Sequence, residues 1–194
     1  MNLSFSSPNF VIKRKGISDS KFRVCAPNGD LLFYVEEKIK WTPPFTTSIR
    51  FFNDEKKTQE ILSATDGKNK EYSSFLEVTD PATSQKIGGV GGDWTNFFED
   101  AWGIVDTEGK PVCNLRESST KRAFLSELTD GLIAQKINYV IGEEIVGELR
   151  QKKVLIGAQL MVDFSMDTAN RVDRRLGLVA AIVVAAHQAK TEAD

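Results

Sequence analysis

Histidine and cysteine are scarce in this sequence: the 194 residues include one histidine, His187, and two cysteines, Cys25 and Cys113. Nucleophilic triads need a histidine beside the nucleophile, and structural zinc sites need several His or Cys ligands. No Gly-x-Ser-x-Gly segment, the mark of an α/β-hydrolase nucleophile, is present. The sequence therefore predicts no catalytic residue, no metal site and no cofactor.

A secretory signal is also lacking, because the first sixteen residues, MNLSFSSPNFVIKRKG, contain no apolar core of the required length. Cys25 and Cys113 each lie in a segment of alternating apolar residues, which is typical of buried thiols in a reducing compartment. We therefore expect free, buried cysteines and a cytoplasmic protein.

An excess of positive charge is absent as well: 25 Lys and Arg stand against 27 Asp and Glu, for a net charge of -2. A general nucleic-acid binder needs a clear surplus of cations to neutralise phosphates, so no nucleic-acid partner is predicted. The apolar share of 41% and the charged share of 27% are those of an ordinary folded protein. The length suits a single domain, which we place at residues 1–194.

The longest apolar run, Leu176–Ala186, is too short to span a membrane, because a spanning helix needs about 20 residues. A run of this length is typical of a buried helix, and one that is apolar all round must be enclosed on every side. Asp173 is a suitable N-cap. We predict a central helix at 174–189, with an N-terminal arm at 1–9 and a tail at 190–194.

Hairpins dominate the remainder of the chain. Four segments show two alternating apolar runs around a turn, namely Phe22–Val35, Phe75–Val90, Trp102–Leu115 and Ile137–Leu149. Further strands are expected at Phe10–Lys15, Ile49–Phe52, Glu60–Ala64 and Val154–Phe164, whereas Ser119–Gly131 fits either a short helix or a strand with a loop. Repeated hairpins must close or stack to hide their edges. The pattern predicts a mainly β protein, a closed antiparallel barrel threaded by its own C-terminal helix.

The hairpin WGIVDTEGKPVCNLRESS (Trp102–Ser119) and the ending DFSMDTANRVDRRLGLVAAIVVAA (Asp163–Ala186) together resemble the tubby C-terminal-like superfamily. This group includes the phospholipid scramblases and the LURP-one-related proteins, and the resemblance extends over most of the chain from Phe10. It implies a closed β-barrel of about twelve strands around a hydrophobic C-terminal helix. It also implies membrane association, because tubby-like members bind phosphoinositide headgroups and scramblase members are associated with calcium and lipid movement.

A calcium loop is the first implied property to test. Asp163, Ser165 and Asp167 have the spacing of the first three ligand positions. However, the sixth position holds Thr168 instead of Gly, and the twelfth holds Arg174 instead of a bidentate Glu. We therefore predict no metal here, but a solvated connection between the last strand and the helix.

Short basic groups provide candidates for contact with lipid phosphates, since each cation near an anionic surface adds about 1 kcal/mol. The same lysines would also keep the outer face of a barrel soluble. Aromatic residues in loops are candidates for membrane or partner contact, with core packing as the alternative. The headgroup candidates are Lys13, Arg14, Lys15, Lys38, Lys40, Arg150, Lys152 and Lys153, and the aromatic candidates are Trp41, Phe45 and Trp94.

Three functions remain open from the sequence. The leading hypothesis is a non-enzymatic cytoplasmic module that binds anionic phospholipid or phosphoinositide headgroups at the membrane surface, without a transmembrane span. The alternative is a protein-interaction or scaffold domain without lipid affinity. The third is an enzyme that uses carboxylates alone.

Overall fold

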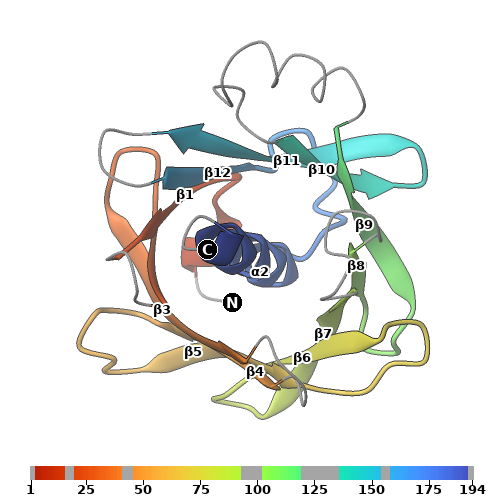
Figure 1. The fold of residues 1–194 in the computed structure, drawn as a ribbon, viewed down its shortest axis with the longest axis horizontal. Coiled ribbons are helices and arrows are strands. Elements are labelled where there is room, and N and C mark those ends of the chain that lie inside the picture. Colours follow the sequence, from red (N-terminus) through yellow and green to blue (C-terminus); the bar gives the residue numbers. More distant parts are fainter. Residues whose placement is uncertain are drawn as a thin grey trace.

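The computed structural model describes residues 3–15, 20–40, 46–92, 102–118, 136–153 and 158–191. Its twelve strands form a closed antiparallel barrel, in which each strand pairs with its sequence neighbours and β1 closes the barrel against β12 (Figure 1). The predicted fold class is confirmed. The strands are β1 (Asn9–Arg14), β2 (Lys21–Cys25), β3 (Leu31–Lys40), β4 (Thr46–Phe52), β5 (Glu60–Asp66), β6 (Ser74–Asp80), β7 (Gln85–Gly92), β8 (Trp102–Val105), β9 (Pro111–Glu117), β10 (Lys136–Ile141), β11 (Glu144–Lys153) and β12 (Ala158–Asp163).

The four predicted hairpins form where the turn residues indicated. Gly29, Gly109 and Gly142 all have positive φ in the turns between β2 and β3, β8 and β9, and β10 and β11. Glycine adopts this conformation without a steric clash, so the chain reverses direction at these residues with little conformational strain. The turns therefore set the meander in which neighbours in sequence become neighbours in the sheet.

Helix α2 (Arg174–Thr191) runs along the inside of the barrel (Figure 1). The backbone N–H of Arg175 donates to Asp173 Oδ1 at 2.9 Å, which confirms Asp173 as the N-cap. Every residue from Leu176 to Ala186 is buried except Ala185, which is partly buried. The apolar run is thus the core of the barrel. None of the described helices is long and apolar enough to cross a membrane.

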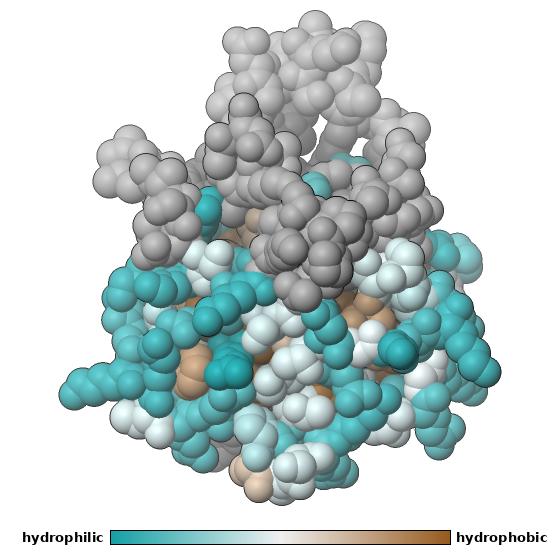
Figure 2. All heavy atoms as spheres, turned by 60° about the horizontal axis from the view of Figure 1, so that its bottom comes forward, coloured by the Kyte–Doolittle hydropathy of each residue, from teal (hydrophilic) through white to brown (hydrophobic). Residues whose placement is uncertain are grey.

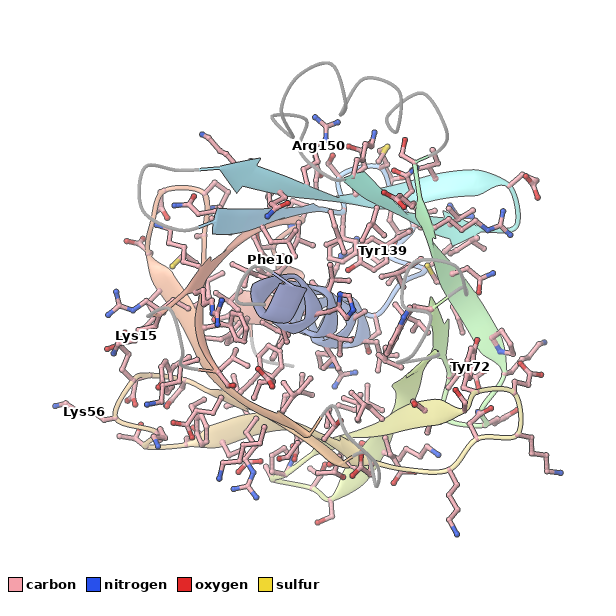
Figure 3. The ribbon with its side chains drawn as sticks, in the orientation of Figure 1. Phe10, Lys15, Lys56, Tyr72, Tyr139 and Arg150 are labelled. Atoms are coloured by element: carbon pink, nitrogen blue, oxygen red, sulfur yellow. The ribbon has the colours of Figure 1, made fainter. Side chains whose placement is uncertain are left out.

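Two aromatic residues fix the helix against the wall. Tyr139 on β10 donates a hydrogen bond from its hydroxyl to the carbonyl oxygen of Gly177 at 2.7 Å. Phe164 lies so close to Gly177 that a Cβ there would be 2.5 Å from the ring. Figure 3 shows Tyr139 and Phe10 directed towards α2 from the surrounding strands. The small residues of the helix are therefore needed, because large rings occupy the space beside it.

A short 3₁₀ helix, η1 (Leu3–Ser6), lies inside the barrel beside α2 (Figure 1). Its Phe5 is 2% exposed and stacks on Phe33 of β3 with ring centroids 4.3 Å apart. The segment predicted as an N-terminal arm therefore contributes to the core and leads into β1 at Asn9.

Glycines make room for aromatic rings on both surfaces of β7 and β8. Outside, Tyr72 covers Gly91 and Gly103, where added Cβ atoms would lie 2.4 Å from its ring and 1.9 Å from its hydroxyl oxygen. Inside, a Cβ on Gly92 would lie 2.4 Å from Trp102. The glycine-rich strand is thus a packing feature of the wall.

Candidate functional site

The closed topology brings distant basic residues onto one part of the outer surface. Strands β11, β12, β1, β2 and β3 are consecutive neighbours around the barrel. We call a set of six cations that face outwards from this sector the basic wall. Its members are Lys13, Lys15, Lys21, Arg23, Lys38 and Lys152.

Strand register aligns three of these cations in one row. Lys152 lies opposite Gln159, Gln159 lies opposite Lys13, and Lys13 lies opposite Arg23. The row faces outwards because side chains alternate along a strand and Ile12, which precedes Lys13, is buried in the core. Residues separated by up to 139 positions in sequence (13 to 152) thus share one surface.

Some members of the basic wall have an acidic partner and others do not. Lys15 Nζ lies 3.3 Å from Glu55 Oε2, and Arg23 pairs with the other oxygen of the same carboxylate. Lys15 also lies 5.8 Å from the centre of the Tyr34 ring. By contrast, no described carboxylate pairs with Lys13, Lys38 or Lys152. Figure 3 shows Lys15 directed away from the barrel.

Two predicted headgroup residues differ from this group. Arg14 has the same strand phase as the buried Phe10 and Ile12, so it faces the interior of the barrel. Arg150 faces outwards, as Figure 3 shows, but donates to Glu148 Oε2 at 2.7 Å. Burial alone would raise the pKa of Glu148, yet hydrogen bonds from Lys136 and Arg150 outweigh it and lower that pKa. Arg150 therefore belongs to a neighbouring ion-pair cluster.

Other predicted site residues lie beyond what the structure describes. Lys40 and Lys153 end strands β3 and β11, and their side chains are not among the described ones. Trp41, Phe45 and Trp94 lie outside the described residues, as does the segment Ser119–Gly131. The predictions for these positions stay predictions.

The structure adds Lys21 and Arg23 to the predicted set. Arg23 lies in the predicted hairpin Phe22–Val35 and Lys21 directly precedes it, at alternating positions of a strand whose other residues are apolar. The signal was therefore present, since Phe22 and Val24 face the core and leave Lys21 and Arg23 outside. What the sequence did not reveal is that β11 and β1 are separated by a single strand.

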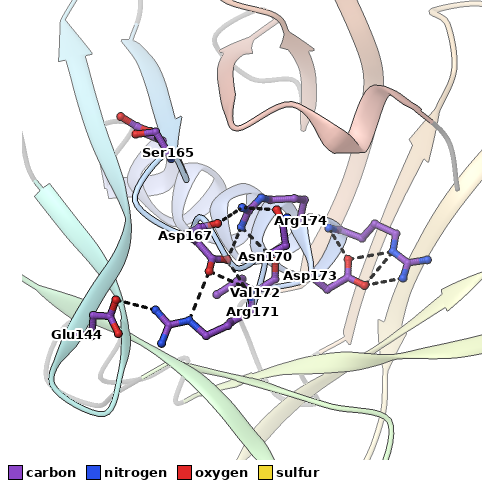
Figure 4. A network of polar contacts seen from close by, with 10 residues as sticks. Glu144, Ser165, Asp167, Asn170, Arg171, Val172, Asp173 and Arg174 are labelled. Carbon is purple, nitrogen blue, oxygen red and sulfur yellow. Dashed lines mark hydrogen bonds and ion pairs between the residues drawn. The ribbon is translucent and has the colours of Figure 1, made fainter.

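The predicted solvated connection before α2 is exposed at 165–166 and 168–171, but it also contains a buried charge. Asp167 is fully buried, and its carboxylate accepts hydrogen bonds from the backbone N–H of Val172 at 2.9 Å and from Arg174 Nη1 at 2.8 Å (Figure 4). The Arg174 guanidinium in turn lies 4.6 Å from the centre of the Phe164 ring. A buried charge needs such partners, so the connection folds as a compact ionic cluster.

This cluster uses the carboxylate of Asp167, one of the three residues that had the spacing of calcium ligands. Burial alone would raise the pKa of Asp167, but the N–H groups of Val172 and Arg171 and the charge of Arg174 outweigh burial and lower it. Arg171 also extends the cluster to Glu144 at 2.8 Å (Figure 4). Among the described residues, no group of three potential ligands is placed to hold a metal ion.

The outer surface of the described barrel is largely polar. On the face shown in Figure 2, teal and white residues predominate, and brown is visible only in small areas between them. Few large apolar side chains are exposed in the part of the chain that is described, and those are Leu31, Ile145, Met161 and Met166. The surface feature that stands out among the described residues is therefore charge.

Comparisons with known proteins agree with the architecture. No family model matches the chain, and no curated protein sequence matches it. The X-ray structure of an Arabidopsis thaliana protein, AT5G01750, is similar, with a TM-score of 0.50 and 13% sequence identity over 92% of this chain and 91% of that one. A likeness at this identity shows the fold alone. It supports the barrel with its C-terminal helix, and membership of the tubby C-terminal-like superfamily stays a prediction.

Proposed function

We propose that this protein is a non-enzymatic cytoplasmic module that binds anionic phospholipid headgroups at the membrane surface through the basic wall. The observation that carries the proposal is the row of Lys152, Gln159, Lys13 and Arg23 across four neighbouring strands, three of which supply a cation. Cations held on one rigid surface can face several phosphates of a bilayer at once, and each contributes about 1 kcal/mol near an anionic leaflet.

Charge distribution explains how a protein of net charge -2 can bind an anionic surface. Lys13, Lys38 and Lys152 have no acidic partner among the described residues, so their charge is directed to solvent. Local charge therefore decides the binding, and salt should weaken it by screening.

Vesicle flotation tests the proposal with phosphatidylcholine vesicles that contain or lack phosphatidylserine. We expect flotation at low salt with the anionic vesicles only, and loss of flotation at high salt. The double substitution Lys13→Gln/Lys152→Gln should weaken the free energy of membrane binding by about 2 kcal/mol. This corresponds to a roughly thirtyfold lower partitioning onto the vesicles.

A matched control is Lys86→Gln/Lys110→Gln, which removes the same charge from the ends of β7 and β9 across the barrel. This variant should float like the parent protein. Equal losses in both double variants would show that net charge alone governs binding, and no flotation of the parent protein at low salt would exclude the function. A stable protein partner that co-purifies in place of lipid would favour the scaffold alternative.

A further inference from the structure

The carboxylate of Glu55 bridges two cations that come from different strands. One oxygen contacts Lys15, which follows β1, and the other contacts Arg23 on β2. The hydrogen bond from Arg23 lowers the pKa of Glu55, so the group is a carboxylate at neutral pH. The side chains of Lys15 and Arg23 thus lie on either side of one small anionic group, the Glu55 carboxylate.

The stability of the sheet does not explain why these cations lie so close together. Lys13 and Arg23 lie directly opposite each other, and like charges in this arrangement destabilise a sheet. Lys15 adds a third positive charge beside them. Lys15 and Arg23 share the single carboxylate of Glu55, and this leaves positive charge for the binding of a further anion.

Glu55 is held in place by a structured turn between β4 and β5. Thr58 donates from its hydroxyl to Asp54 at 2.6 Å, and its backbone N–H donates to the same carboxylate at 3.2 Å. Glu36 of β3 is already paired with Lys57 at 2.8 Å. The turn therefore presents Glu55 to Lys15 and Arg23 from outside the barrel wall.

The ion pairs of Glu55 with Lys15 and Arg23 are exposed to solvent, so another anion can replace the carboxylate. The side chains of Lys15, Arg23 and Glu55 are 45%, 46% and 33% exposed. Exposed ion pairs contribute little to stability because water and salt screen them. A phosphate monoester carries about -1.5 to -2 charge and three acceptor oxygens, so it satisfies both cations better than one carboxylate does.

We propose that Lys15 and Arg23 form a binding site for a phosphate monoester, and that Glu55 occupies this site in the free protein as an internal competitor. The inference rests on the proposed function in taking the basic wall as a phosphate-binding surface. Binding of a phosphate displaces the Glu55 side chain, while the turn that carries it stays in place.

Glu55→Gln tests the competitor role, because it keeps the size of the side chain and removes its charge. Phosphatidic acid vesicles probe a lipid source of the monoester, and inorganic phosphate followed by NMR titration probes a soluble source. We expect Glu55→Gln to bind phosphate about fivefold more tightly, as release of an exposed ion pair allows. Glu55→Asp, which shortens the side chain, should give a smaller increase.

The matched control is Glu77→Gln, since Glu77 is an exposed acid paired with Lys86 at 2.9 Å on another part of the wall. It removes the same charge and should leave the affinity unchanged. Adding Lys15→Gln and Arg23→Gln to Glu55→Gln should abolish the gain. Far-UV circular dichroism checks that each variant is folded.

The outcomes separate the two proposals. If the parent protein floats with anionic vesicles but Glu55→Gln and Glu77→Gln bind phosphate equally, the competitor role is wrong and the membrane function stands. If no vesicle is bound but Glu55→Gln selectively tightens the binding of inorganic phosphate, the site stands with a soluble ligand and the membrane function fails. Binding that survives loss of both Lys15 and Arg23 would overturn the site.

Discussion

At the residue scale, positions that look minor in the sequence decide how the barrel is filled. The carbonyl oxygen of Gly177 accepts a hydrogen bond from the Tyr139 hydroxyl. The absence of a side chain at Gly177 lets the Phe164 ring pack against the helix backbone. Asp167 supplies the negative charge around which the connection before α2 folds. Cys113 is buried, and burial raises the pKa of its thiol to about 12. Cys25 and Cys113 are both free and buried, as the sequence predicted.

Gly177→Ala should destabilise the protein by about 1–3 kcal/mol, the usual cost of forcing an extra methyl group into a packed core. The added Cβ would lie 2.5 Å from the Phe164 ring. Urea denaturation measures the change in the free energy of unfolding. The double variant Gly177→Ala/Phe164→Leu should recover part of the loss, and an additive double variant would show that the ring is not the cause.

Asp167→Asn should lower the free energy of unfolding by about 3–5 kcal/mol, because it leaves the charge of Arg174 buried without its counter-ion. It should also change the pH dependence of unfolding. Since the folded pKa of Asp167 is lowered, its contribution is complete above the unfolded value of about 3.9 and is lost as the pH falls through the folded pKa.

Urea unfolding at a series of pH values from neutral to acidic measures this effect. The parent protein should lose stability below about pH 4, and Asp167→Asn should lose less over the same range. Some acid sensitivity should persist in the variant, because the pKa values of Glu144 and Glu148 are also lowered. Parallel pH curves for the two proteins would contradict the role assigned to Asp167.

At the element scale, the sequence predicted what local chemistry determines. Turn residues such as Gly29 and Gly109 marked the hairpins, and an uninterrupted apolar run marked the central helix. The contact between Lys15 and Glu55 was not predictable, because it joins residues 40 positions apart through the register of four strands. The burial of Asp167 was missed for a similar reason: its partner Arg174 was judged as a failed calcium ligand instead of a counter-ion.

Removal of α2 by ending the chain after Asp173 should unfold the barrel. The helix fills the interior with residues that are almost all buried, and nothing else described in the structure could replace that volume. Far-UV circular dichroism and amide-proton dispersion in NMR spectra measure the loss. If the shortened protein kept a cooperative thermal transition, the helix would not be the core of the fold.

At the scale of the whole molecule, closure depends on a pairing between the first and last strands. Five register pairs, from Asn9 with Asp163 to Lys13 with Gln159, join β1 to β12. Closure removes every exposed edge from the sheet, and edges are the usual starting points of aggregation. Contacts so distant in sequence also predict folding on the slow timescale of β-barrels.

Ile12→Pro tests closure, because Ile12 pairs with Leu160 on one side and Val24 on the other. Proline removes a backbone donor and should open the seam, so that the exposed edges associate. Size-exclusion chromatography with light scattering should detect oligomers or aggregates. The control Ile12→Ala keeps the backbone donor, and it should lose about 2–5 kcal/mol of stability yet stay monomeric.

The position of α2 at the end of the element order has a consequence for synthesis. All twelve strands leave the ribosome before the helix around which they pack, and at about 5–20 residues per second this interval lasts seconds. During that time the inner surfaces of the strands, rich in Phe and Val, have no core to cover. Folding to the closed state can therefore be completed only after translation has delivered the helix.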